Sequence, residues 1–325
     1  MQTFAHFVSV EEQKHEQSAG AGPKGPAPKG NNRSSHSVSA IITPYLFILP
    51  AFAIYGIFVL FPFVRLIKFS LYDWNGISKH PIWVGFNNYI DVLLRHDFWT
   101  ALSHNLWWVL LASIPIILGL ALAVILHFGK PRGRNLYRTI VFLPYTLAVV
   151  VSGLMWEWIY QPQIGALNVL LRSIGLGSLA HGWLGDPNTA LTSLAMAGAW
   201  TGYGFCMVLF LSGLAGIDTT LFDAARIDGA NAWQQFRYVT LPGLANTMNV
   251  VVIIVFIYTM RVFDFVFITT KGGPIDSTQV LATMVYRETF EFFHVGIGST
   301  YAVITMFIIF AASAIYLYLR ERSAA

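Results

Sequence analysis

Six long apolar segments are the feature that most constrains this chain, because a helix needs about 20 apolar residues to cross a bilayer. About a quarter of the residues in a soluble domain are charged, whereas 11% of this chain is charged and 55% is hydrophobic. The sequence therefore predicts an all-α integral membrane protein with six transmembrane helices. We expect the spans near residues 41–65, 103–128, 139–160, 189–215, 244–268 and 296–319.

The first 38 residues differ in composition from everything that follows. The stretch 20–32 is rich in glycine, proline and lysine, and such a stretch buries too little apolar surface to offset the entropy of ordering it. We therefore expect a disordered cytoplasmic tail over residues 1–38 and a six-helix transmembrane domain over residues 39–325. A cleaved signal peptide does not fit, because the first apolar segment is long and follows a long polar stretch.

The basic residues of the short loops predict the orientation, since cytoplasmic loops carry an excess of lysine and arginine. Loop 129–138 holds four basic residues and no acidic one, whereas loop 161–188 carries Arg172 alone. We therefore expect a multi-pass protein of the plasma (inner) membrane, with both termini, loop 129–138 and loop 216–243 on the cytoplasmic side. Loop 66–102 weakens this bias slightly, because it places three basic residues outside.

Loop 216–243, between the fourth and fifth spans, begins with the pattern of a short capped helix. Thr220 and Asp223 fit a capping box, in which each side chain binds the backbone amide of the other residue. This pattern predicts a helix over about 221–228 that ends at Gly229 in the left-handed conformation. Contact with a basic partner is the alternative role of Asp223.

The rest of the loop predicts a second helix and a surface for a partner protein. Trp233 and Phe236 would share one face of that helix, and Pro242 suits the first turn of the fifth span. A polar insertion of this kind is typical of a docking element. Small side chains would let another backbone approach closely, and apolar ones would fill a pocket on the partner. The small residues are Ala224, Ala225 and Gly229, and the apolar ones are Leu221, Phe222 and Ile227.

This loop resembles the EAA loop of permease subunits of binding-protein-dependent ABC importers, of the carbohydrate (maltose/glycerol-phosphate permease-like) type. The pattern of that family is an acid and two alanines, then Asp-Gly-Ala, an aromatic residue and Leu-Pro. The matching residues here are Asp223, Ala224, Ala225, Asp228, Gly229, Ala230, Phe236, Leu241 and Pro242. The family usually has glutamate where this chain has Asp223, which shortens the reach of the acid by one methylene.

Other segments extend the resemblance over most of the chain after the tail. Each segment by itself is weak evidence for the family, and together the segments are a specific indication of it. They are 86–89 with 98–99, then 168–171 with 183–187, and 271–274 with Ser277, Thr278 and Tyr286.

The resemblance implies a function and a set of partners. The helix after the fourth span would be a coupling helix, which seats in a groove of an ATPase subunit and transmits ATP-driven closure to the membrane helices. The chain would be a permease subunit that moves a sugar or oligosaccharide into the cell. Its partners would be a second homologous permease, a dimer of ATP-binding subunits and an extracytoplasmic solute-binding protein, within a lipid bilayer.

The chain carries no motif for hydrolysing ATP or for other catalysis. It lacks Gly-x-x-x-x-Gly-Lys-[Ser/Thr], His-Glu-x-x-His and Gly-x-Ser-x-Gly. Its one cysteine, Cys206, excludes an intrachain disulfide and a cysteine metal cluster, and its nine histidines are scattered. We therefore expect a non-catalytic channel subunit with no metal or cofactor of its own, whose partner ATPases bind ATP and magnesium. The net charge of +4 gives no indication of nucleic-acid binding.

Ionisable and aromatic residues within the spans are candidates for the solute path. Ionisable groups inside a membrane mark a pathway or a paired structural site, and sugar recognition combines hydrogen-bonding groups with aromatic faces. The candidates are Trp156, Glu157, Trp200, Tyr203, Asn249, Tyr258, Arg261 and Asp264. Arg261 and Asp264 are three residues apart on the fifth span, so they would share a face and could form a structural pair. Anchoring at the membrane interface is the alternative role of the aromatic residues.

Two other functions stay open at this point. An importer of the same class for glycerol phosphate or a polyol would share the loop motifs, and a cluster of cavity-facing arginine and lysine would favour the phosphate ester. An ATP-independent secondary carrier belongs to a different class. Carriers often contain inverted repeats, which this chain does not show, and a carrier would not need a docking loop.

Overall fold

The structure, a computed structural model, describes residues 38–129 and 131–324. The expected tail over residues 1–38 therefore lies outside the described residues except for Val38, and so does Lys130 of the basic loop. The chain divides into two compact units, Met1–Val59 and Leu60–Ala325. In the first unit, helix α2 covers Val38–Tyr55, and the π-helical segment η1 (Gly56–Leu60) begins.

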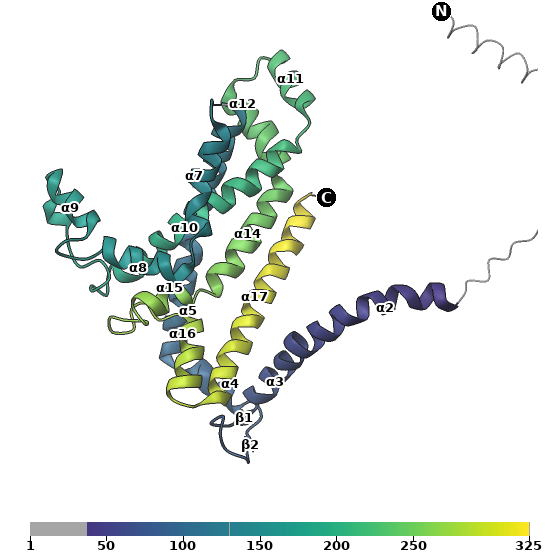
Figure 1. The fold of residues 1–325 in the computed structure, drawn as a ribbon, viewed down its shortest axis with the longest axis vertical. Coiled ribbons are helices and arrows are strands. Elements are labelled where there is room, and N and C mark those ends of the chain that lie inside the picture. The colour runs from purple at the N-terminus through teal and green to yellow at the C-terminus, as the bar shows by residue number, and fades with distance from the viewer. Residues whose placement is uncertain (1–37, 130, 325) are drawn as a thin grey trace, which may run out of the picture. The chain divides into compact units, whose positions relative to one another are not determined.

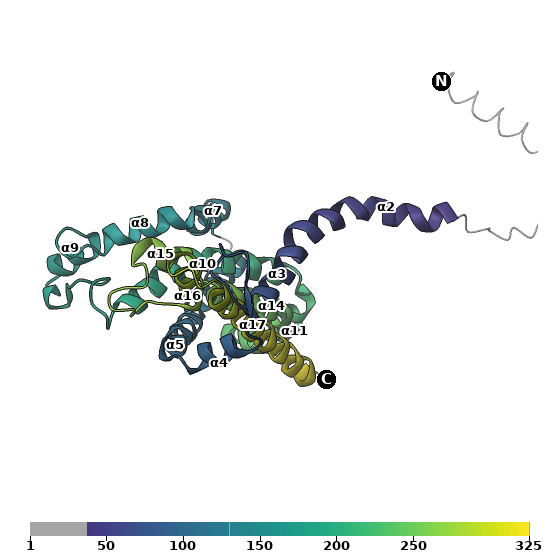
Figure 2. The same ribbon diagram turned by 90° about the horizontal axis from the view of Figure 1, so that it is seen from below.

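The second unit has two distinct ends, which Figure 1 shows with α11 and α12 at one and β1, β2 and α4 at the other. We call them the α11 end and the β end. Helices α5 (His96–Leu111), α6 (Ser113–Phe128), α10 (Ala190–Ala215), α14 (Ala245–Met260) and α17 (Val295–Ala324) form its bundle. Helices α8 (Val149–Ile159) and α9 (Ala166–Ser173) extend to one side of this bundle, as Figure 2 shows.

Among the described residues, five helices are long and apolar enough to cross a membrane. They are Phe47–Ser70, which includes α3 (Phe61–Ser70), His96–Phe128, Ala190–Ala215, Ala245–Thr269 and Val295–Arg320. A sixth span exists if α7 (Arg134–Thr146) and α8 are counted as one bent pair. These helices overlap the predicted apolar segments, and the prediction of a single third helix over residues 139–160 is wrong.

The third span breaks at Leu147 and Ala148, close after a proline. Helices α7 and α8 meet at 93°, and Pro144 lies in the last turn of α7. Proline weakens the turn that precedes it, because it lacks an amide and clashes with the carbonyl four residues earlier, yet α7 continues through Pro144 to Thr146. Leu147 and Ala148 then adopt extended conformations, with ψ of 139° and 137°.

Small residues let the bundle helices approach closely. A Cβ atom on Gly119 of α6 would lie 2.5 Å from Cβ of Cys206 on α10, and one on Gly204 would collide with the backbone of α7 at Val141. Small residues at such contacts are typical of helix packing in membranes, where close van der Waals packing drives association. Cys206 and its neighbours Met207 and Phe210 are fully buried at this contact.

The fifth span is also broken, and a buried asparagine holds the break in place. Helix α14 ends at Met260, and α15 (Asp264–Thr269) begins after a three-residue gap. Nδ2 of the fully buried Asn105 donates to the carbonyls of Thr259 and Met260, both at 3.3 Å. Its Oδ1 accepts from the amide of Leu281, 2.9 Å away, at the start of α16 (Leu281–Tyr286). One side chain therefore joins three helices.

The β end is closed by a small hairpin and a buried carboxylate. Strands β1 (Tyr72–Asp73) and β2 (Ile82–Trp83) pair antiparallel, and α4 (Asn87–Leu94) follows them. Arg95 Nη1 donates to the buried Glu288 of η4 (Arg287–Glu291) at 2.8 Å. His294 Nδ1 lies 3.0 Å from the other oxygen of this carboxylate. These contacts fix the start of α5 against the segment that precedes α17.

We predict that Asn105→Leu lowers the stability of the protein by about 1–3 kcal/mol, because it leaves buried backbone groups of α14 and α16 without partners. The measurement is the apparent Tm of the detergent-solubilised protein. Ser103→Ala is the control, since Ser103 is exposed and its hydroxyl binds only the carbonyl of Thr100 in its own helix. Equal Tm values for Asn105→Leu and the wild type would contradict this role.

Candidate functional site: an exposed loop and a central cavity

The first helix of loop 216–243 is capped by a residue that the sequence reasoning missed. Helix α11 covers Thr219–Ile227, and Asp218 is its N-cap. Asp218 Oδ1 accepts from the amide of Thr220 at 2.9 Å. The predicted capping box of Thr220 and Asp223 is therefore wrong, because Asp218 starts the helix two residues earlier and Thr220 lies within its first turn. Hydrogen bonds from Thr220, chiefly from its backbone amide, hold the pKa of Asp218 below its ordinary value.

Asp223 takes part in a surface ion pair and does not cap the helix. Its Oδ1 lies 2.8 Å from Nη1 of Arg226, one turn along α11, and both side chains are exposed. Exposed pairs of this kind contribute little stability because water screens them. The carboxylate therefore stays accessible to a second basic group.

The predicted end of α11 is confirmed. Gly229 has φ of +76°, a left-handed conformation that glycine adopts at little cost. No atom lies within 4 Å of the position that a Cβ atom on this glycine would occupy. A larger side chain at Gly229 would therefore project into open space on the surface of the loop.

The predicted second helix of the loop begins with its own capping box and continues through three consecutive helical segments. Helix α12 covers Ala232–Gln235, and the side chains of Asn231 and Gln234 each accept from the other residue's amide. The Asn-x-x-Gln spacing would have indicated this cap. Trp233 and Phe236 lie on one face as predicted, with ring centroids 5.5 Å apart. The chain continues through η3 (Phe236–Thr240) and α13 (Leu241–Gly243), whose first turn contains Pro242.

The motif residues of the loop divide into outward-facing and inward-facing sets. Those exposed are Leu221, Asp223, Ala224, Asp228, Gly229 and Pro242, and those at least partly buried are Phe222, Ala225, Ala230, Phe236 and Leu241. Phe222 is only 6% exposed. It packs against Phe128, the last residue of α6, with ring centroids 5.2 Å apart. The prediction that Phe222 fills a pocket on a partner is therefore wrong, because the chain's own α6 covers it.

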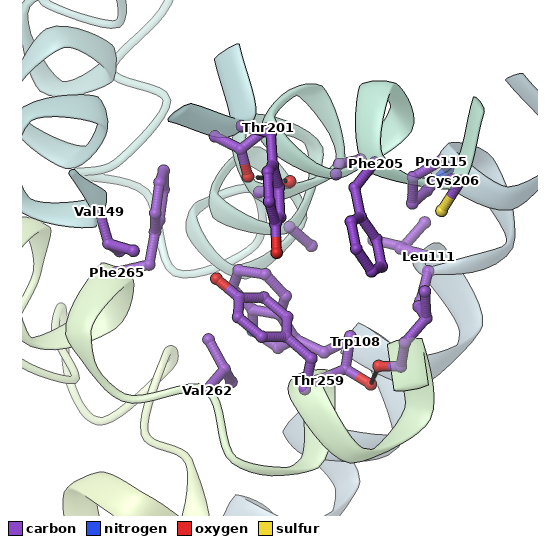
Figure 3. Close-up of a pocket in the computed structure, with 18 of the residues that line it drawn as sticks. Trp108, Leu111, Pro115, Val149, Thr201, Phe205, Cys206, Thr259, Val262 and Phe265 are labelled. Atoms are coloured by element: carbon purple, nitrogen blue, oxygen red, sulfur yellow. Dashed lines mark hydrogen bonds between the residues drawn. The ribbon is translucent and has the colours of Figure 1, made fainter. Parts of the chain in front are cut away.

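A central cavity of about 340 Å³ lies between the helices of the bundle. Figure 3 shows aromatic and aliphatic side chains around it, among them Trp108, Phe205 and Phe265. Both helix breaks border it, since Leu147 and Val149 come from the α7–α8 break and Val262 from the α14–α15 break. Irregular backbone at membrane depth is tolerated where it is buried in protein or lines a cavity.

Hydroxyl groups supply most of the polar lining of the central cavity. Thr201 and Thr259 donate to carbonyls of their own helices, which leaves their oxygens able to accept. The buried hydroxyl of Ser152 has no hydrogen-bond partner in the protein. Tyr145 stacks on Phe205 at 4.8 Å, and Tyr258 also lines the cavity. Such a mixture of apolar faces and a few polar groups is typical of small-molecule sites.

Only Tyr258 of the predicted path residues lines the central cavity. Trp156 packs edge-on against Trp200, with centroids 5.7 Å apart. Tyr203 is partly buried on α10. Asn249 lies near the start of α14, where its Oδ1 accepts from Tyr316 and Arg320, both at 3.0 Å.

The cavity residues Trp108, Tyr145 and Phe205 were not among the predicted path residues. Their sequence context resembles that of every other aromatic residue in a span, so no local signal marks them.

Glu157 opens to a second cavity of about 380 Å³, which we call the loop cavity. Its lining also includes Tyr160, Gly182, Leu184, Gly185, Thr269, Thr270 and Pro274. Helices α8 and α15 thus contribute to both this cavity and the central one.

Arg261 and Asp264 do not share a helical face. Helix α14 stops at Met260 and Asp264 begins α15, so the expected three-residue spacing on one helix is lost. The two side chains form no ion pair. Arg261 instead borders a groove of about 660 Å³, which Met306 and Phe310 of α17 also line. The predicted structural pair is therefore wrong.

Comparison with known proteins identifies a family. The family described as "Binding-protein-dependent transport system inner membrane component" matches residues 115–324. A probable ABC transporter permease protein of Pyrococcus horikoshii is 36% identical over 85% of this chain and 95% of its own length. The trehalose/maltose transport system permease protein MalF of Thermococcus litoralis is 31% identical over 84% and 92%.

The fold also matches a solved structure. A chain in the crystal structure of a bacterial ABC transporter involved in the import of the acidic polysaccharide alginate superposes with a TM-score of 0.75. The match covers 88% of this chain and 97% of that chain, at 22% sequence identity. The arrangement of the helices is therefore that of an ABC permease.

We predict that Asp218→Ala loosens α11, because the amide of Thr220 loses its acceptor. Hydrogen–deuterium exchange of the segment 219–227 should become faster in this variant. Asp218→Asn, which keeps an acceptor at the N-cap, should exchange like the wild type.

Low pH should loosen α11 in the wild type, as the Asp218→Ala substitution does. The lowered carboxyl pKa means that ionised Asp218 stabilises the helix. This stabilisation is complete at pH values above the ordinary pKa of aspartate, and it is lost as the pH falls through the lowered pKa. Exchange in the wild type, corrected for intrinsic rates, should therefore rise in acid, and exchange in Asp218→Asn should not. Identical exchange in Asp218→Ala and the wild type would show that Asp218 does not hold α11.

Proposed function

The chain belongs to the family of binding-protein-dependent transport system inner membrane components, and from this membership we propose that it imports a sugar or oligosaccharide. It is a transport permease subunit embedded in the membrane. In this proposal it forms half of the channel, with a second homologous permease as the other half. The chain itself is not catalytic and holds no cofactor, since ATP and magnesium bind to a dimer of partner ATPase subunits.

The observation that carries the proposal is the exposed coupling loop at the α11 end. Asp223, Ala224, Asp228 and Gly229 present an acid and small side chains to the outside, without bulky neighbours over Gly229. A thin surface of this kind lets another protein's backbone approach closely. A secondary carrier would have no use for it, because its energy comes from the solutes that it moves.

The central cavity supports a sugar as the solute. Sugars present apolar ring faces together with many hydroxyls, and aromatic side chains beside hydrogen-bonding groups complement both. Trp108, Tyr145 and Tyr258 supply the aromatic surfaces, and Ser152 and Thr201 supply hydroxyls. The relative from Thermococcus litoralis, a trehalose/maltose permease, points to the same solute class.

The cavity lining does not favour a phosphate ester. Among the described residues that line the central and loop cavities, Glu157 carries the one charged side chain. A phosphate site calls for arginine or lysine, and Arg261 opens to the separate groove beside α17. Glycerol phosphate is thus the weaker alternative, whereas an uncharged polyol would suit the same lining as a sugar.

We propose that the α11 end faces the cytoplasm. Arg320 near the end of α17 binds Asn249 near the start of α14, so the last span returns to the end that carries the coupling loop. The basic residues predict this side as cytoplasmic. The β end, with loops 66–102 and 270–294, would then receive solute from an extracytoplasmic binding protein.

Transport by such a subunit requires two arrangements of the bundle with similar energies. Solute delivery favours the outward-open arrangement, and separation of the ATPases favours the inward-open one. The breaks after Thr146 and Met260 border the central cavity, so movement at either break changes the shape of the cavity. We infer the direction of transport, into the cell, from family membership.

Affinity purification from the native membrane in mild detergent, followed by mass spectrometry, tests the proposed assembly. We expect an ATPase, a second six-span protein and a solute-binding protein to co-purify. The binding protein can then be screened against neutral sugars, polyols and phosphorylated sugars. A chain that purifies alone and moves solute without ATP would contradict the proposal.

We predict that Gly229→Trp abolishes ATPase capture and uptake while membrane insertion is retained. The indole would project from the open surface of the loop and block the approach of another backbone. Co-purification of the ATPase measures this effect.

Gly175→Trp is a matched control for strain, because Gly175 also has a positive φ, of +84°, and open surroundings. It follows α9 and lies outside the coupling loop. Capture should survive in this control. Normal ATPase capture by Gly229→Trp would show that this part of the loop does not contact the ATPase.

A further inference from the structure

The coupling helix rests on a single aromatic side chain. Within α11, Phe222 is buried and Ala225, one turn later, is partly buried, whereas the other residues are exposed. Residues three apart share one face of a helix. Within the part of the chain that the structure describes, this narrow face is the covered side of α11, and Phe222 is its one large buried side chain.

The partner of Phe222 belongs to a helix distant in sequence. Its ring meets that of Phe128 in a T-shaped arrangement, with centroids 5.2 Å apart and planes at 66°. Edge-to-face contacts of this kind are favourable and directional. Phe128 is 41% exposed, so Phe222 covers part of the side chain at the end of α6.

Phe128 is also the last residue of a helix that reaches the central cavity. The segment His96–Phe128 is one helical span of 33 residues. Trp108, Leu111 and Pro115 of the same span line the central cavity. Pro115 belongs to the same helix as Phe128, α6, so a displacement of Phe128 has a path within one helix to the cavity wall.

Coupling through the backbone alone would take a different route. The chain enters α11 from α10 through Gly216 and Ile217 and leaves it through α12 and η3 toward α14. Neither connection includes α5 or α6. The contact between Phe222 and Phe128 adds a third route, to helices that backbone continuity does not join to the loop.

We propose that Phe222 is a positioning residue that transmits movement of the coupling helix through Phe128 to the α5–α6 wall of the central cavity. This rests on the proposed function, since α11 moves in this way only if an ATPase drives it. Phe222 itself touches neither the ATPase nor the solute. Its role is to make the α11 helix and the end of α6 move as one body.

The test is Phe222→Ala in the complete complex of permeases, ATPases and binding protein. We expect ATPase capture and ATP hydrolysis to be retained, and uptake per ATP to fall by about 5- to 150-fold, the usual range for coupling between sites. Phe307→Ala is the matched control, because Phe307 is 67% exposed on α17 and lies outside the coupling loop and the cavities. It should leave uptake unchanged.

A double-mutant cycle separates a shared contact from two independent defects. Phe128→Ala should reproduce the loss of uptake, and the double variant should be no worse than either single variant, because both remove the same contact. If Phe222→Ala does not insert into the membrane, Phe128→Ala tests the same contact from its other side. Additive losses would overturn the proposal, and so would loss of ATPase capture by Phe222→Ala.

A cross-link gives an independent measurement. With cysteines at positions 128 and 222, a short bifunctional thiol reagent should join the two helices without stopping transport, because they move together. Cys206 is fully buried and does not compete for the reagent. Loss of transport on cross-linking would show that the two helices separate during the cycle.

Uptake by the wild-type complex distinguishes failure of the proposed function from failure of the link through Phe222. If the wild-type complex takes up no sugar with ATP, the proposed function fails. If the wild type transports sugar and Phe222→Ala transports it equally well, the link through Phe222 fails and the proposed function stands.

Discussion

The structure depends on satisfying backbone polar groups at the places where its spans break. Lipid offers no hydrogen bonds to a free amide or carbonyl, so a broken span needs partners from within the protein. Asn105 provides them for the α14–α15 break, where it binds two carbonyls of α14 and the first amide of α16. Residues at both breaks line the central cavity, so the contacts that fix a break also fix the shape of the space for a solute.

The spans could be predicted from apolar length, and the end of α11 from the conformational preference of glycine. Local patterns did not reveal contacts between distant segments. The side chain of Phe222 suits a partner's pocket as well as it suits Phe128, and only the fold decides between them. Arg261 and Asp264 have pairing spacing only if the helix continues, and a sequence without proline there gives no sign that it stops.

The outward and inward faces of α11 together explain how the chain would use energy from partner ATPases. The coupling loop presents an acid and small side chains outward, while the same short helix turns one phenylalanine inward. The outward face suits a partner, and the inward face reaches the long helix that lines the cavity. The cavity itself is nearly uncharged, aromatic and hydroxyl-lined, which suits neutral polyhydroxylated solutes better than phosphate esters.

Uptake of a labelled sugar into proteoliposomes tests the central claim most directly. The chain would be reconstituted with its partner permease and ATPases, supplied with the loaded binding protein, and compared with and without hydrolysable ATP. Our account predicts accumulation against a gradient only when ATP is hydrolysed. Equal uptake without ATP, by the chain alone, would contradict it and identify a secondary carrier.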